Sequence, residues 1–188
     1  MSNSTAAAVF TTPDLEEALG VVRTFLGIAD LTFAEVDFEA TIRSREGVAG
    51  VLKVLPELDW RAAEASEPRS AKTGDDPAQC LPVSVHDWSH PLDLAEPFIR
   101  ALRVEDAAAV RWDLSGWPEV PEAGLEEISQ KYAYLTLSVN SRDLYQYECS
   151  PGHTVHVHVR AGRDLDRVRW LAAQVGGHFT GRTELAPL

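Results

Sequence analysis

Residues 32–42 read TFAEVDFEATI, and this stretch decides the fold class. Apolar side chains stand at every second position from Ala34 to Ile42, and between them lie Glu35, Asp37, Glu39 and Thr41. A period of two with one apolar face is typical of a half-buried β-strand. Such a strand needs a second layer that covers its apolar face.

The last third of the chain repeats this alternation. We predict strands at 133–139, 144–149 and 154–160, because apolar residues alternate with polar ones there and turn-forming residues occupy 140–143 and 150–152. Three strands at this spacing indicate an antiparallel meander.

The covering layer is predicted to be helical. Apolar stripes at helical spacing predict amphipathic helices at 12–27, 44–55, 93–102 and 164–176. Further strands are expected at 58–63, 82–88 and 108–114, with a short helix at 125–130. The predicted fold class is α+β, a mainly antiparallel sheet with amphipathic helices packed on one face.

The length of the chain and its loop-forming residues indicate the domain organisation. We expect a flexible N-terminus at 1–11 and a single α+β domain at 12–188, since 188 residues suffice for one core. Residues 64–80 lack apolar periodicity and predict a long surface loop. Stretches 36–52 and 155–171 both run strand, arginine, turn and helix, which is compatible with a duplication or with the frequency of such units.

The net negative charge of the chain argues against two classes of partner. Acidic residues outnumber basic ones 29 to 17, for a net charge of −12, and residues 1–94 hold 16 of the acidic against 7 basic residues. This balance argues against binding nucleic acid or anionic membranes. No stretch approaches the roughly 20 apolar residues of a membrane span. With only Cys80 and Cys149 and no export signal, we expect a cytoplasmic protein.

One polar face could carry function. If strand 32–42 and the meander share a sheet, their polar faces coincide. That face would hold Glu35, Asp37, Glu39, Tyr134, Thr136, Ser138, Gln146, Glu148, Thr154, His156, His158 and Arg160. The alternative is a solvated outer face, which antiparallel sheets commonly have.

The favoured function is that of a small acidic binding protein, such as an immunity or antitoxin-like inhibitor of a basic partner protein. Glu35, Asp37 and Glu39 would steer the partner, and Trp88 and Trp117 would anchor it. The chain is expected to be a monomer or a homodimer.

The alternative is an enzyme or small-ligand binder centred on His156 and His158. Two residues apart on a strand, both imidazoles point the same way and could hold a divalent metal such as zinc. Glu148 would assist and Arg160 would bind an anion, which makes these four residues the catalytic candidates. No cofactor or metal is favoured, and the sequence leaves open whether the protein is an enzyme and which substrate or partner it takes.

Overall fold

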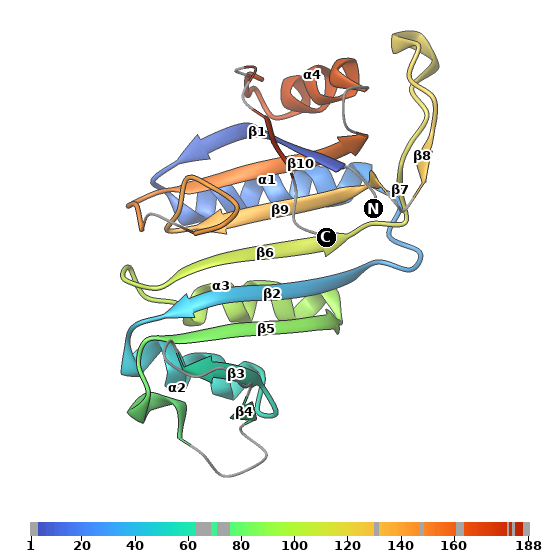
Figure 1. Cartoon of the computed structure of the whole chain (residues 1–188). Coiled ribbons are helices and arrows are strands. Elements are labelled where there is room, and N and C mark those ends of the chain that lie inside the picture. Colours follow the sequence, from blue (N-terminus) through green and yellow to red (C-terminus); the bar gives the residue numbers. More distant parts are fainter. Residues whose placement is uncertain are drawn as a thin grey trace.

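The computed structural model describes residues 4–62, 69–70, 76–129, 132–146, 149–160, 164–179, 181 and 183–185. A nine-stranded sheet has the order β11-β1-β10-β9-β6-β2-β5-β3-β4, and all neighbouring strands are antiparallel (Figure 1). Its strands are β1 (Ser4–Thr12), β2 (Glu35–Ile42), β3 (Asp59–Ala62), β4 (Arg69–Ser70), β5 (Val83–His90), β6 (Ala107–Asp113), β9 (Tyr134–Val139), β10 (His153–Arg160) and β11 (Thr183–Leu185). Strands β7 (Gly116–Trp117) and β8 (Ile128–Ser129) form a separate antiparallel pair.

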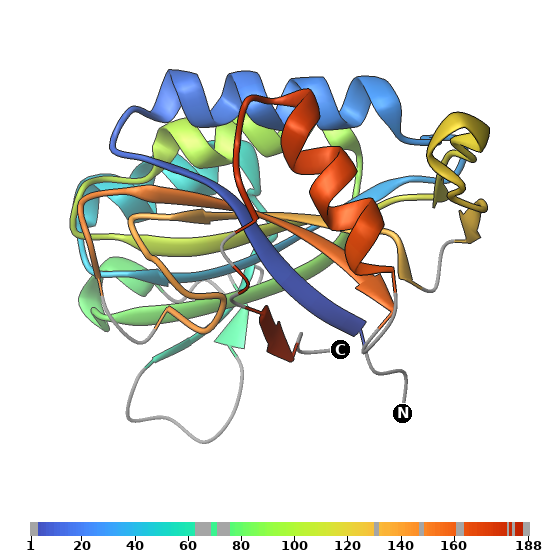
Figure 2. The ribbon, with the colours of Figure 1, turned by 90° about the horizontal axis from the view of Figure 1, so that it is seen from above.

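The α-helices lie on one face of the sheet (Figure 2). They are α1 (Leu15–Ile28), α2 (Arg45–Val54), α3 (Ala95–Ala101) and α4 (Leu165–Gln174). Short 3-10 helices are η2 (Pro77–Gln79), η3 (Leu92–Leu94) and η4 (Pro121–Ala123). The predicted class, an antiparallel sheet with helices on one face, is confirmed.

Two βαββαβ units, one inserted into the other, explain the strand order. The inner unit runs β2-α2-β3-β5-α3-β6, and its strands stand in the order β6-β2-β5-β3. The outer unit begins with β1-α1, resumes with β9-β10-α4-β11 and has the order β11-β1-β10-β9. Each unit follows the ferredoxin-like motif, and the pairing of β6 with β9 joins them. The similar stretches 36–52 and 155–171 fall on β2-α2 of the inner unit and β10-α4 of the outer unit.

Three predictions about local structure are wrong. Residues 4–12 form β1, between β10 and β11, instead of a flexible N-terminus. Their run of alanines gives little strand signal because alanine is depleted in strands. The strands that pair with β1 come from near the other end of the chain. Residues 144–145 form a turn where a strand was predicted at 144–149, of which 147–148 lie outside the described residues, and 128–129 form β8 within the predicted helix. The expected loop 64–80 lies mostly outside the described residues, which include β4 and η2 within it.

Asp106 fixes the end of β2, the strand that carries the acidic residues. This carboxylate is fully buried, and its Oδ1 accepts hydrogen bonds from the backbone N–H groups of Arg43 (2.7 Å) and Ser44 (3.1 Å). Its Oδ2 accepts from the Ser44 hydroxyl (2.9 Å) and from the Arg103 N–H (2.9 Å). Ser44 in turn caps α2 by accepting from the Gly47 N–H. The buried charge is thus fully hydrogen-bonded, as burial requires.

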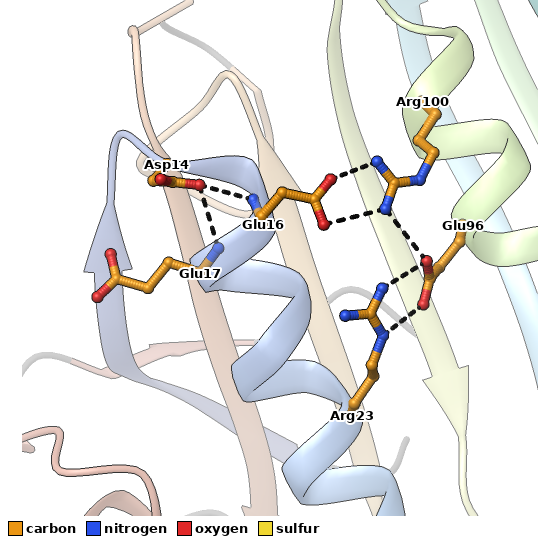
Figure 3. Close-up of polar contacts among 6 residues, drawn as sticks. All are labelled: Asp14, Glu16, Glu17, Arg23, Glu96 and Arg100. Carbon is orange, nitrogen blue, oxygen red and sulfur yellow. Dashed lines mark hydrogen bonds and ion pairs between the residues drawn. The ribbon is translucent and has the colours of Figure 1, made fainter.

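The outer surface of α1 and α3 is a network of exposed ion pairs (Figure 3). Arg23 binds Glu96 with two hydrogen bonds of 2.7 Å, and Arg100 binds Glu16. Asp14 caps α1 by accepting from two backbone N–H groups. The four ion-pairing side chains are exposed and paired with each other, and exposed ion pairs of this kind contribute little to stability.

Candidate ligand-binding site on the polar face of the sheet

The face of the sheet that turns away from the helices carries the polar side chains. Phe38 stacks on Phe98 of α3 with 4.3 Å between ring centroids, so its neighbours Asp37 and Glu39 point to the other face. The prediction that the acidic strand and the histidine strand share one sheet is confirmed, with β6 and β9 standing between β2 and β10.

The part of this face on β9 and β10, here called the histidine half, is closed to solvent around its two central histidines. His156 is 0% and His158 is 2% exposed. The segment after β9 and strand β11 lie on this side of the sheet (Figures 1 and 2), and they meet where Leu144 N–H donates to Glu184 Oε2 (3.4 Å). The expectation of a solvated outer face is therefore wrong for this half.

The geometry gives no support to a metal site at the histidines. Nε2 of His158 lies 2.9 Å from the Thr136 hydroxyl, and Nε2 of His156 lies 3.4 Å from the Ser138 hydroxyl. Among the described residues, no three His, Cys, Asp or Glu side chains are grouped as metal ligands. The Nε2 atoms of His156 and His158 thus face hydroxyl groups of β9, where a metal ion was the predicted alternative.

The other two catalytic candidates are Arg160 and Glu148. Arg160 is exposed, and its guanidinium lies 4.8 Å from the centre of the Tyr132 ring. Glu148 falls outside the described residues. The predicted constellation of His156, His158, Glu148 and Arg160 is therefore not assembled within the part of the chain that the structure describes.

The part of the polar face on β2, β6 and the end of β5, here called the acidic half, holds a carboxylate–guanidinium cluster. Arg111 donates from Nη2 to Asp37 Oδ2 (2.6 Å) and from Nε to Asp113 Oδ1 (3.0 Å). Burial raises the pKa of Asp113 to about 6, against the opposing effect of Arg111. The pKa of Arg111 is raised, because the two carboxylates outweigh its burial. Arg111 also lies 5.2 Å from the centre of the Tyr134 ring.

A pocket with a cavity volume of about 50 Å³ opens over this cluster and reaches the edge of the histidine half. Its floor and walls come from β2, β5, β6, β9, β10 and the turn after β9. The lining residues are Asp37, Phe38, Glu39, Trp88, Ala109, Arg111, Thr136, Leu144 and His158. Because Ala109 contributes only a methyl group at the centre of this face, space remains between the longer side chains.

A β-bulge places Trp88 on the rim of the pocket. The register between β2 and β5 shifts between Val36 and Phe38, and Ser89 has a positive φ of 62°. The Ser89 N–H donates to Asp37 Oδ1 (2.9 Å), which secures the bulge to the acidic cluster. Trp88 is 63% exposed. Bulges commonly redirect a side chain next to a binding site.

The predicted partner-binding residues have different surroundings. Trp88 is exposed as expected, but Trp117 is fully buried, donates from Nε1 to the His158 carbonyl (3.2 Å) and packs against Phe25. The prediction that Trp117 is an exposed anchor is wrong, because β7 folds back onto α1 and β10. Glu35 and Glu39 remain accessible, whereas Asp37 is 9% exposed and paired with Arg111.

Two buried polar atoms near the pocket lack a hydrogen-bond partner among the described residues. One is Nδ1 of His158, and the other is Oε1 of Gln146, which is 7% exposed. The Gln146 amide nitrogen donates to the Glu39 carbonyl (3.3 Å), so the amide oxygen is the atom left without a donor. Buried polar atoms of this kind usually meet a protein group, a water molecule or a ligand.

Thr136 and His158 form the one hydroxyl–imidazole pair among the described lining residues. A hydroxyl beside an imidazole is the arrangement of an activated nucleophile. Burial, with smaller effects of His156 and Arg111, lowers the pKa of His158 to about 3. An imidazole with so low a pKa is a poor base near neutral pH. The pair therefore favours binding over nucleophilic catalysis.

Sequence reasoning missed Arg111 and Asp113 as site residues. They stand two positions apart in a predicted strand, which places both on one face. This Arg-x-Asp spacing was the available signal, but only the register that sets Asp37 opposite Arg111 shows that they belong to the acidic face.

Comparisons with family models, curated proteins and solved structures found no match for this chain. None of the described helices combines the length and apolar character that a membrane crossing needs.

Proposed function

We propose that this protein binds a small organic molecule in the pocket between Trp88, Glu39 and Ala109. The observation that carries the proposal is the convergence, in one pocket, of a partly buried carboxylate–guanidinium cluster, an exposed tryptophan and a buried histidine with an unpartnered nitrogen. Ligand sites typically combine apolar walls with a few convergent polar groups whose pKa values are perturbed.

A fragment screen by amide NMR on the full chain tests this proposal. We expect hits that shift the amide signals of Asp37, Ala109 and Thr136 in a saturable way. Ala109→Leu should abolish these shifts by filling the pocket, whereas Ala173→Leu, on the exposed surface of α4, should leave them unchanged. The absence of any hit at the pocket, or equal binding by folded Ala109→Leu protein, would contradict the proposal.

The second candidate function is inhibition of a basic partner protein, as an immunity or antitoxin-like protein would do. The specific observation in its favour is that Trp88, 63% exposed, lines the same pocket as the accessible Glu39, while Glu35 is exposed on the same strand as Glu39, in a chain of net charge −12. An exposed aromatic residue within an acidic surface suits an anchor in an electrostatically steered interface.

Affinity capture from cells of the source organism, followed by reconstitution with the purified partner, tests the second function. We expect to recover a basic protein that binds one to one and more weakly at high salt. Its binding should be lost when Trp88→Ser is combined with Glu35→Gln and Glu39→Gln. Binding that is unaffected by these changes and by salt would exclude a role for this surface.

A further inference from the structure

The described lining of the pocket has little positive charge to offer a ligand. Its cation is Arg111, whose Nη2 and Nε donate to Asp37 and Asp113. The second oxygen of Asp37 accepts the Ser89 N–H. The Arg111 guanidinium thus donates hydrogen bonds to both carboxylates of this cluster. A ligand anion would have to compete with those two carboxylates for Arg111.

Glu39 is the carboxylate that remains accessible in the pocket. Its side chain is 44% exposed, and Nδ1 of His86 lies 3.9 Å from its Oε1. The backbone carbonyl of Glu39 holds the Gln146 amide, whose Oε1 lacks a donor among the described residues. On this side of the pocket, the Glu39 carboxylate is therefore an accessible hydrogen-bond acceptor in the lining.

Trp88 and the apolar residues supply the rest of the complementarity. The indole is 63% exposed at the rim, and the His86 ring stands 6.3 Å away at a tilt of 33°. An aromatic face attracts cations, and Ala109 and Leu144 offer an apolar surface to a ligand's carbon skeleton.

We infer that the ligand of this pocket is a small organic cation, with an ammonium group bound by Glu39 and a flat or apolar body against Trp88. This inference rests on the proposed ligand-binding function and names the class of ligand. Buried His158 is neutral because burial lowers its pKa, so it adds no opposing charge.

Three probes of nearly equal shape separate charge from shape: benzylamine, benzyl alcohol and benzoate. In NMR titrations of the full chain we expect benzylamine to bind at the pocket about tenfold more tightly than benzyl alcohol, and benzoate to bind more weakly still. Glu39→Gln should weaken benzylamine binding about fivefold. Glu46→Gln, which removes the same charge from α2 on the helical face, is the matched control.

The outcomes distinguish the two proposals. If benzyl alcohol or benzoate binds at the pocket as tightly as benzylamine, or if benzylamine fails to bind there while other fragments do, the cation inference is wrong and the binding function stands. If no fragment of any class binds at the pocket, both fail. Equal effects of Glu39→Gln and Glu46→Gln would also overturn the inference, because Glu39 would then contribute only net charge.

Discussion

The histidine half and the acidic half of one sheet face differ in what covers them. Both consist of strands on which polar residues alternate with apolar ones. The segment after β9 and strand β11 lie on the polar side of the sheet, and His156 on that side is fully buried. In contrast, the Glu39 side chain is 44% and Trp88 is 63% exposed. Alternation therefore identifies the polar face of a sheet, but segments distant in sequence decide whether that face meets solvent.

The two halves also handle charge differently. In the histidine half, burial keeps His158 neutral. In the acidic half, Asp37 and Asp113 share the charge of Arg111. The differences in burial and in charge lead to four predictions.

Acid should destabilise the protein through His158. Its pKa is about 3 in the folded protein against an ordinary 6.5, so the unfolded chain binds more protons between these values and stability falls as pH drops. For this group we expect a loss of about 3 kcal/mol between about pH 7 and pH 4.5, measured by urea unfolding. His158→Gln should remove that part of the pH dependence. An unchanged pH slope in this variant, or an equal change in His178→Gln on the surface, would contradict the burial of a neutral imidazole.

Removing the guanidinium should destabilise the acidic half. Arg111→Met leaves Asp37 and Asp113 without their cation, and we expect a loss of about 2 kcal/mol in unfolding free energy, less than for a fully buried pair because the cluster is partly exposed. Adding Asp37→Asn and Asp113→Asn to Arg111→Met should restore much of the lost unfolding free energy. The control is Arg160→Met, on the same sheet but exposed. An equal loss in both single variants would mean that the cluster has no special role.

Asp113 should give a pH dependence of opposite sign to His158. Its folded pKa of about 6 exceeds the ordinary 3.8, so the folded protein holds this proton more tightly and stability falls as pH rises between these values. With the side chain 30% exposed, we expect a contribution of about 1 kcal/mol. Unfolding curves of Asp113→Asn should lack this decline. If the variant and the natural protein keep the same pH profile from about 4 to 6.5, the raised pKa is excluded.

The smallest effect on stability is expected at the rim of the pocket. Trp88→Ser should change the unfolding free energy by less than about 0.5 kcal/mol, because the side chain is mostly in solvent. Leu144→Ala, in the segment on the polar side, should cost about 3 kcal/mol, since Leu144 is 2% exposed. Thermal unfolding of both variants checks this contrast, and comparable losses would show that the rim is part of the core.

Much of the fold was predictable from local pattern, and the site was predictable only in part. The alternation in 32–42 and 154–160 correctly predicts β2 and β10, and Ser44 caps α2 as its position indicates. By contrast, the small residues of β1 become a strand only because β10 and β11 pair with them.

The site depends on register and on long-range packing. Asp37 and Trp88 were recognisable as polar or exposed residues, but Arg111 joins them only because β2 and β6 pair in one particular register. Trp117 resembles a surface residue in a loop rich in proline and acids, yet contacts with Phe25 and the His158 carbonyl bury it. Such contacts leave no local trace in the sequence.

The most direct measurement is a crystal structure of the protein grown with benzylamine at saturating concentration. We expect electron density for the ligand in the acidic half, with its nitrogen within hydrogen-bond distance of the Glu39 carboxylate and its ring against Trp88. Ligand bound only elsewhere on the molecule, or a pocket without ligand in a crystal where Glu39 and Trp88 are free of lattice contacts, would contradict the assignment of this pocket.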